Sequence, residues 1–283
     1  MRVLVLGSTG LLGHAIMRQT EIQAIGLARS GADVSADISQ TGVLSEVLQT
    51  TDPDLVINAA ANVNLADCEA NPEQAMLINA EPARILAKWS RAQERPFVQI
   101  STDHFFDTGG RKKHTEQDKI ICLNQYAHSK YQAEQYASTA PKALILRTAL
   151  LGIHPDGRGF ANWAMQALTS RKPLTLFDDF YGSLIDTDDF TSAMLQMVRQ
   201  GAHGIYNLAA SEVASKQQFV HALAAHANIN LDWATTGSVV GLMPRRARCL
   251  GLDVSRAEAV LGYSLPGLQA VTGRVVNAWR NSQ

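Results

Sequence analysis

The chain has few of the features that mark several large classes of protein. It contains only three cysteines in 283 residues. Cys68, Cys122 and Cys249 are odd in number and widely spaced, and none forms a C-x-x-C pair. Such cysteines are typical of small buried residues in a reducing compartment, and they favour neither a disulfide framework nor a zinc site. We therefore expect a cytoplasmic protein without a bound metal.

An excess of one charge and a long apolar run are also lacking. The formal net charge is −1, which gives no electrostatic reason to expect nucleic acid or an anionic membrane as a partner. No apolar run reaches the roughly 18 residues that a membrane span requires. The apolar N-terminal segment is interrupted by Gly7 and Gly10 and lacks a small-residue cleavage site, so it is not expected to be a signal peptide.

The N-terminus has the pattern of a dinucleotide-binding turn. A short apolar run at residues 2–6 precedes Gly7-Ser8-Thr9-Gly10-Leu11-Leu12-Gly13, and a helical pattern covers residues 11–18. Glycines at this spacing permit a tight turn and a close approach of the backbone to a diphosphate, and the following helix start offers N–H groups to it. We expect this segment to bind a dinucleotide.

Strand-like and helix-like patterns alternate through the first half of the chain. Strands are expected at 23–28, 55–59, 97–100 and 143–146, and helices at 43–49, 73–93 and 125–138. This alternation predicts an α/β protein with a Rossmann-like, doubly wound parallel sheet. We assign residues 1–150 to a dinucleotide-binding domain and 151–283 to a smaller substrate-binding region. A strand near 204–209 is left open as an additional strand of the main sheet.

Tyr126-Ala-His-Ser-Lys130 is the pattern that predicts chemistry. Residues four apart on a helix share a face, so both side chains can point at one site. A neighbouring ammonium group favours the phenolate of a tyrosine and makes it a better acid-base group near neutral pH. Ser101-Thr102-Asp103 follows an expected strand, and the hydroxyl of Thr102 or Ser101 can stabilise negative charge on a carbonyl oxygen. The pattern indicates nicotinamide-dependent carbonyl or alcohol chemistry.

The end of the second expected strand bears on the choice of cofactor. An NAD-specific site usually has an acidic residue at this position, which binds the ribose 2′-hydroxyl. This chain has Arg29 instead, followed by Ser30. A guanidinium group stabilises a 2′-phosphate, so we expect NADPH, with NADH as a second cofactor left open.

With these motifs in place, the chain resembles the extended short-chain dehydrogenases/reductases, and most closely the dTDP-4-dehydrorhamnose reductase group. The resemblance covers nearly the whole chain. Besides the motifs above, it rests on Asp37-Ile38, Ile57-Asn58-Ala59-Ala60-Ala61, Asn79, Arg147-Thr148, Phe160, Asp179-Phe180-Tyr181-Gly182, Pro244-Arg245 and Leu252-Asp253-Val254-Ser255.

The resemblance implies a role for each matching position. Thr102, Tyr126 and Lys130 would be catalytic, and Lys130 would also hold the nicotinamide ribose. Together with the glycine turn, the cofactor-binding residues would be Arg29, Asp37, Ile38, Ala59, Ala60, Ala61 and Asn79. The substrate-binding residues would be Asn62, Asp103, His104, Phe160, Gly182 and Arg245, with Arg246 also suited to a diphosphate. The substrate would be a nucleotide-linked sugar, and association as a homodimer is left open.

Four functions fit the sequence. The first is an NADPH-dependent reductase of a nucleotide-linked 4-keto-6-deoxy sugar, with a tyrosine as proton donor. The others are a reductase of another carbonyl compound, a sugar-nucleotide epimerase or dehydratase, and a non-catalytic regulatory subunit similar to that of methionine adenosyltransferase. His104 and the segment Ala149-Leu150-Leu151 depart from the reductase pattern, which leaves the particular sugar open.

Overall fold

The computed structural model describes residues 1–107 and 110–283. The chain forms two compact units, each built from several segments. Unit 1 comprises Met1–Thr102, Cys122–Arg147 and Met197–Tyr206, and unit 2 comprises Asp103–Ile121, Thr148–Gln196 and Asn207–Gln283. Segment 103–121 therefore belongs to unit 2, although it lies in the part of the sequence assigned to the dinucleotide-binding domain.

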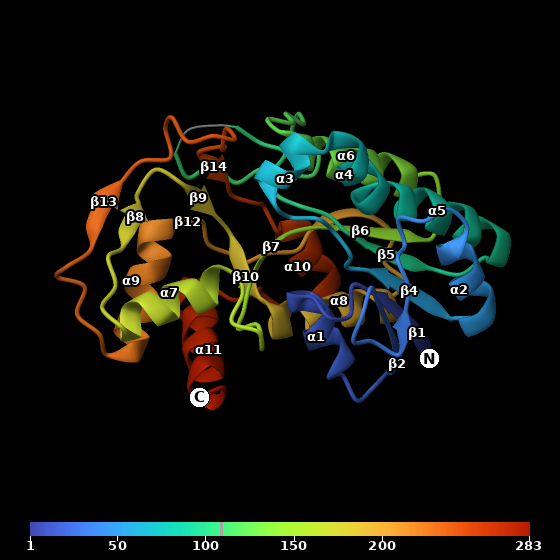
Figure 1. The fold of residues 1–283 in the computed structure, drawn as a ribbon, viewed down its shortest axis with the longest axis horizontal. Helices are drawn as coiled ribbons and strands as arrows, with labels where there is room; N and C mark the ends of the chain where they lie inside the picture. The colour runs from blue at the N-terminus through green and yellow to red at the C-terminus, as the bar shows by residue number, and fades with distance from the viewer. Residues whose placement is uncertain (108–109) are drawn as a thin grey trace. The chain divides into compact units, whose positions relative to one another are not determined.

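Unit 1 contains a seven-stranded sheet in the order β11-β6-β5-β4-β1-β2-β3 (Figure 1). Its strands are β1 (Arg2–Leu6), β2 (Gln23–Ala28), β3 (Val34–Ser35), β4 (Leu55–Asn58), β5 (Phe97–Ile100), β6 (Ala143–Arg147) and β11 (Gly204–Asn207). The strands from β6 to β3 pair in parallel. The strand order reverses direction beside β1, so the Rossmann-like, doubly wound sheet expected from the sequence is confirmed. β11, the segment left open as a returning strand, lies next to β6.

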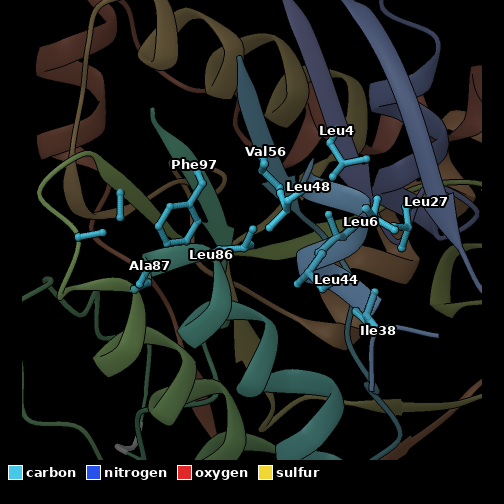
Figure 2. Close-up of a cluster of buried hydrophobic side chains, with 14 of the residues drawn as sticks. Leu4, Leu6, Leu27, Ile38, Leu44, Leu48, Val56, Leu86, Ala87 and Phe97 are labelled. Carbon is cyan, nitrogen blue, oxygen red and sulfur yellow. The ribbon is translucent and has the colours of Figure 1, made fainter. Parts of the chain in front are cut away.

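Buried aliphatic side chains explain why these segments form central strands. Every residue of β4, β5 and β6 is buried, as expected for parallel strands covered on both faces. Figure 2 shows one layer of this core, in which Leu4, Val56 and Phe97 of the sheet meet Leu48 of α2 (Val43–Thr51) and Leu86 of α5 (Glu81–Gln93).

The helices of unit 1 differ from expectation in two places. The single helix expected at 73–93 is two helices, α4 (Pro72–Asn79) and α5. The break precedes Pro82, which lacks an N–H and whose ring would collide with a preceding carbonyl inside a continuous helix. Helix α3 (Leu65–Ala70) was not expected, and Asn64 caps its N-terminus by accepting a 3.1 Å hydrogen bond from the Asp67 N–H. The remaining helices of the unit are α1 (Leu11–Met17) and α6 (Gln125–Ala137).

In the residues that the structure describes, unit 2 contains short strands and several helices, and the end of one of these helices belongs to unit 1. Two-stranded sheets pair β7 (Ala149–Leu151) with β10 (Leu184–Asp186) and β8 (Thr175–Phe177) with β13 (Thr235–Gly237). A three-stranded sheet places β9 (Tyr181–Gly182) between β12 (Ala214–Ser215) and β14 (Cys249–Leu250). The helices are α7 (Phe160–Thr169), α8 (Thr187–Arg199, whose last residues lie in unit 1), α9 (Lys216–Ala227), α10 (Ser255–Leu261) and α11 (Leu268–Asn281).

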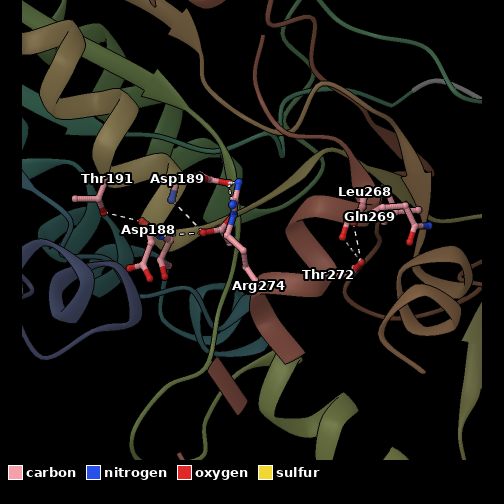
Figure 3. Close-up of polar contacts among 9 residues, drawn as sticks. Asp188, Asp189, Thr191, Leu268, Gln269, Thr272 and Arg274 are labelled. Carbon is pink, nitrogen blue, oxygen red and sulfur yellow. Dashed lines mark hydrogen bonds and ion pairs between the residues drawn. The ribbon is translucent and has the colours of Figure 1, made fainter. Parts of the chain in front are cut away.

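A carboxylate and an arginine connect two helices of unit 2 (Figure 3). Asp186 accepts hydrogen bonds of 3.1 and 3.0 Å from the backbone N–H groups of Asp188 and Asp189, at the start of α8. Arg274 on α11 then donates to Asp189 at 2.8 Å and to Asp186 at 3.3 Å. These contacts fix the start of α8 against α11.

The described residues contain neither a membrane-spanning helix nor a cluster of metal-binding side chains. None of the helices combines the length and the apolar character that crossing a bilayer would demand. Likewise, residues 1–107 and 110–283 contain no group of three or more His, Cys, Asp and Glu side chains arranged to hold a metal ion.

Candidate active site

The glycine turn of unit 1 is packed too tightly for side chains at two of its glycines. Gly7 has φ +78°, and a Cβ there would lie 2.8 Å from the backbone N and Cα of Ala60. At Gly13, a Cβ would lie 2.2 Å from the carbonyl oxygen of Gly7. The turn is tied to β2 because the Gly7 N–H donates to the Leu27 carbonyl at 2.8 Å. Bare backbone is therefore presented where the ends of β1, β2 and β4 meet, which fits a bound dinucleotide.

The residues expected around the adenosine follow β2 and β3. Arg29 is exposed immediately after β2. Asp37 accepts hydrogen bonds from the hydroxyl of Ser39 at 2.7 Å and from its N–H at 3.0 Å. These bonds, with a smaller contribution from the charge of Arg29, lower the pKa of Asp37 and keep it ionised. Ile38 is buried in the core beside them.

Both the oxygen and the nitrogen of the Asn79 side-chain amide form hydrogen bonds within the protein. It is fully buried, and its Oδ1 accepts a 2.7 Å hydrogen bond from the N–H of Asn62. Its Nδ2 donates to the carbonyl of Asn62 at 3.1 Å and to the hydroxyl of Ser129 at 2.8 Å. Asn79 therefore holds the loop that contains Ala59, Ala60 and Ala61 against α6.

The three residues expected to be catalytic all lie in unit 1 and are buried. Thr102 follows β5 and is 3% exposed, Tyr126 is 8% exposed and Lys130 is 3% exposed. Asn124 caps α6 by accepting a 2.9 Å hydrogen bond from the Ala127 N–H, which starts the helix just before Tyr126. Lys130 lies one turn further on and donates from Nζ to the carbonyl oxygen of Ile100, the last residue of β5, at 2.6 Å. The helix thus presents its lysine to the end of the strand that precedes Thr102.

Burial sets the electrostatics of Lys130. Loss of solvent lowers the pKa of its ammonium group to about 8, and the charge of Glu134 opposes part of that shift. Desolvation disfavours a cation, whereas a carboxylate nearby favours it. Lys130 therefore changes charge close to physiological pH.

Unit 2 contains a cavity of about 230 Å³ with aromatic walls and two cationic residues. Phe160, Trp163, Phe177 and Phe180 line it together with Lys216 and Arg246. The ammonium Nζ of Lys216 lies 4.0 Å from the centre of the Phe160 ring and 5.6 Å from that of Phe180. An aromatic cavity with a few placed polar groups is the usual form of a small-molecule site.

Lys216 is held in place by the start of its own helix. Ser215 and Gln218 form a reciprocal capping box, with hydrogen bonds of 3.1 and 2.9 Å, so Lys216 becomes the first residue of α9. Burial lowers the pKa of Lys216 to about 8, while Asp103 raises it and Arg246 lowers it. His104 belongs to the same charged neighbourhood, because burial, followed by Lys216 and Arg246, lowers its pKa to about 4.

Several of the residues expected to bind substrate are grouped in unit 2. Asp103 lies 3.9 Å from His104, and a Cβ on Gly182 would lie 4.0 Å from the Asp103 carboxylate. Phe160 lines the cavity, whereas Asn62 lies in unit 1. Arg245 is 66% exposed and forms a 2.6 Å ion pair with Asp107, while its neighbour Arg246 lines the cavity.

Lys216 is a charged residue of the cavity that the sequence motifs did not predict. It belongs to no recognisable motif in the sequence, and most of the residues that line the cavity with it lie far from it in the chain, from Phe160 to Phe180 before it and at Arg246 after it. The only local signal was the capping pattern Ser215-Lys216-Gln217-Gln218, which indicates a helix start but not a ligand.

The chain is similar to several known proteins. The family model described as RmlD substrate binding domain matches residues 1–279. A probable low-salt glycan biosynthesis reductase from Haloferax volcanii is 28% identical over 95% of both chains. The dTDP-4-dehydrorhamnose reductase of Salmonella typhimurium is 27% identical over 74% of this chain and 73% of its own. Among solved structures, dTDP-4-dehydrorhamnose reductase from Bacillus anthracis in complex with NADP has a TM-score of 0.88 at 22% identity, covering 97% of this chain and 98% of its own.

Proposed function

Because the chain belongs to the RmlD substrate binding domain family and is an oxidoreductase, we propose that it reduces the carbonyl group of a nucleotide-linked 4-keto-6-deoxy sugar with NADPH. The family resemblance drawn from the sequence motifs is thereby confirmed. The observation that carries the proposal is that Thr102, Tyr126 and Lys130 are all buried in the same unit as the glycine turn, with Lys130 bound to the end of the strand that precedes Thr102.

The glycine turn and the residues after β2 would hold the cofactor. The bare backbone from Gly7 to Gly13 would bind a diphosphate, and Arg29 would offer its guanidinium group to a 2′-phosphate. NADP in the Bacillus anthracis relative supports this assignment. The proposal also includes NADH as a second cofactor, because an exposed arginine does not prevent binding of a cofactor that has a ribose 2′-hydroxyl in place of the 2′-phosphate.

Bound in this way, the reduced nicotinamide supplies a hydride to the carbonyl carbon. Tyr126 donates its phenolic proton to the carbonyl oxygen, so the C=O group becomes a CH–OH group. The ammonium of Lys130 favours the tyrosinate that results, and Thr102 donates a hydrogen bond to the same oxygen as negative charge develops on it. Tyrosinate is then reprotonated from solvent.

The cavity of unit 2 would recognise the nucleotide part of the substrate. Its aromatic walls accept a planar base, and the cations of Lys216 and Arg246 suit a diphosphate. Asp103 and His104 would contact the sugar, with His104 neutral at physiological pH because burial lowers its pKa to about 4. A neutral imidazole offers both a donor and an acceptor to sugar hydroxyl groups.

The test is oxidation of NADPH with a dTDP-4-keto-6-deoxy sugar, followed by the absorbance of the reduced nicotinamide and repeated with NADH. We expect turnover that is faster with NADPH and is lost in Tyr126→Phe. Binding of NADPH without turnover of this sugar would contradict the proposed substrate. It would favour another carbonyl compound as substrate, or a regulatory role. Turnover that survives in Tyr126→Phe would contradict the proposed proton donor.

A further inference from the structure

A buried ion pair lies one helical turn beyond Lys130. Glu134 is 0% exposed, and its carboxylate accepts two hydrogen bonds from Arg147, the last residue of β6, at 2.9 and 2.7 Å. A third hydrogen bond comes from the hydroxyl of Ser101 at 2.6 Å. Nothing in the proposed chemistry requires a carboxylate here, and burying an ion pair is costly unless geometry and hydrogen bonding are good.

Lys130 and the Glu134–Arg147 pair are hydrogen-bonded to two consecutive residues at the end of β5. Lys130 donates to the carbonyl oxygen of Ile100, and Glu134 holds the side chain of Ser101, the very next residue. The Ser101 N–H in turn donates to the Leu146 carbonyl at 2.7 Å, immediately before Arg147. Thr102 follows directly, so these contacts fix the backbone on which both Lys130 and Thr102 depend.

We infer that Glu134 is a positioning residue for this site: with Arg147 it anchors the end of β5, to which Lys130 is bound, and it provides a negative charge one helical turn from the Lys130 ammonium. The inference rests on the proposed function, in which that ammonium holds the nicotinamide ribose. Glu134 acts through Lys130 and Ser101 and need not touch cofactor or substrate.

The charged surroundings of Lys130 favour this role for Glu134. Glu134 is the charged group that acts on Lys130, and Arg147 on β6 is paired with its carboxylate. Two thiols lie around the same helix: Cys122, before α6, is affected by the charge of Glu134, and Cys68 on α3 packs with Tyr126. Burial raises the pKa of both cysteines, that of Cys122 to about 11, so the thiols stay neutral. Among these groups, Glu134 is the carboxylate.

The test is a fluorescence titration of NADPH binding across the pH range that surrounds the pKa of Lys130. Wild-type affinity should decline as pH rises through about 8, where Lys130 loses its charge. In Glu134→Gln the amide keeps the shape of the side chain but lacks the charge, and Arg147 stays cationic. The decline should therefore begin about one pH unit lower, the usual size of such an effect.

Two further variants separate charge from anchoring. Ser101→Ala removes one hydrogen bond and keeps the ion pair, so its affinity should fall at every pH without displacement of the pH profile. Glu134→Gln combined with Arg147→Met removes both buried charges, and a smaller displacement in the same direction is expected. This double variant also serves if Glu134→Gln alone does not fold.

Glu81→Gln is the matched control, because Glu81 forms an exposed pair with Arg84 on α5. It should leave the affinity and its pH profile unchanged. A folded Glu134→Gln or double variant with the wild-type pH profile would overturn the inference. NADPH binding without reduction of the sugar would contradict only the proposed function, while a wild-type chain that binds neither NADPH nor NADH would overturn both.

Discussion

The side-chain amide of Asn79 donates a 2.8 Å hydrogen bond to the hydroxyl of Ser129, whose own proton is donated to the carbonyl of Tyr126 at 2.8 Å. Both side chains are buried, at 0% and 1% exposure. The end of α4 is thus connected to the turn of α6 that contains the expected proton donor.

Replacing Asn79 with alanine should therefore reduce both stability and activity. The change leaves the N–H and carbonyl of Asn62 without their partner, which costs about 1–3 kcal/mol of the free energy of unfolding. Urea unfolding and kcat would measure the two effects. Asn71→Ala, which removes an exposed amide near α4, is the control and should change neither. Equal losses in the two variants would contradict the role of Asn79.

Tyr126→Phe should lower kcat by about a hundredfold or more, because a phenyl ring cannot donate the proton. NADPH affinity should change little, since the ring itself remains. Tyr136→Phe, on the same helix, is the matched control and should retain normal turnover. Steady-state rates and an NADPH titration of each variant test this prediction, and equal kcat values for Tyr126→Phe and Tyr136→Phe would contradict it.

Arg29→Ser should weaken NADPH binding about tenfold or more, the size expected when a charge-assisted hydrogen bond is lost. NADH binding should be unchanged, because the cofactor then lacks the 2′-phosphate. Arg171→Ser removes an exposed arginine paired with Asp232 and is the control for charge alone. Parallel losses for NADPH and NADH would show that Arg29 does not select the cofactor.

Arg245 and Arg246 are consecutive in the chain, but their replacement should affect the KM for the nucleotide sugar differently. Lys216→Gln and Arg246→Gln should each raise KM for the nucleotide sugar about tenfold, because each removes a cation from the cavity wall. Arg245→Gln should have a smaller effect, since that guanidinium pairs with Asp107. The KM and kcat of all three variants are compared at one pH. A larger effect at Arg245 would place the diphosphate outside the cavity.

His104 should make stability sensitive to acid. Its folded pKa of about 4 lies below the ordinary value of 6.5, so between these values the unfolded chain binds more protons than the folded one. Stability is therefore lost as pH falls from about 6.5 towards 4. His104→Gln should lose less stability over the same range, as measured by urea unfolding. A second buried histidine, His114, also has a pKa lowered by burial, but it is present in both proteins, so the difference between their curves reports His104. Parallel curves for wild type and variant would refute the assignment.

Local sequence patterns predicted the dinucleotide half of the molecule well. The glycine turn, the apolar strands and the Tyr126–Lys130 pair depend on residues close together in the chain, where periodicity and backbone sterics dominate. The parallel sheet and the family followed from them, and both are confirmed. Even here Pro82 divided a helix that periodicity alone had predicted as continuous.

The tertiary structure decided what depends on residues distant in sequence. It brought Ser101, Glu134 and Arg147 into one buried cluster, and it gathered Phe160, Lys216 and Arg246 around one cavity. It also directed Arg246 into that cavity and paired Arg245 with Asp107, although the two arginines are consecutive. Side-chain direction and long-range pairing arise from packing in three dimensions, for which a pattern along one segment contains no signal.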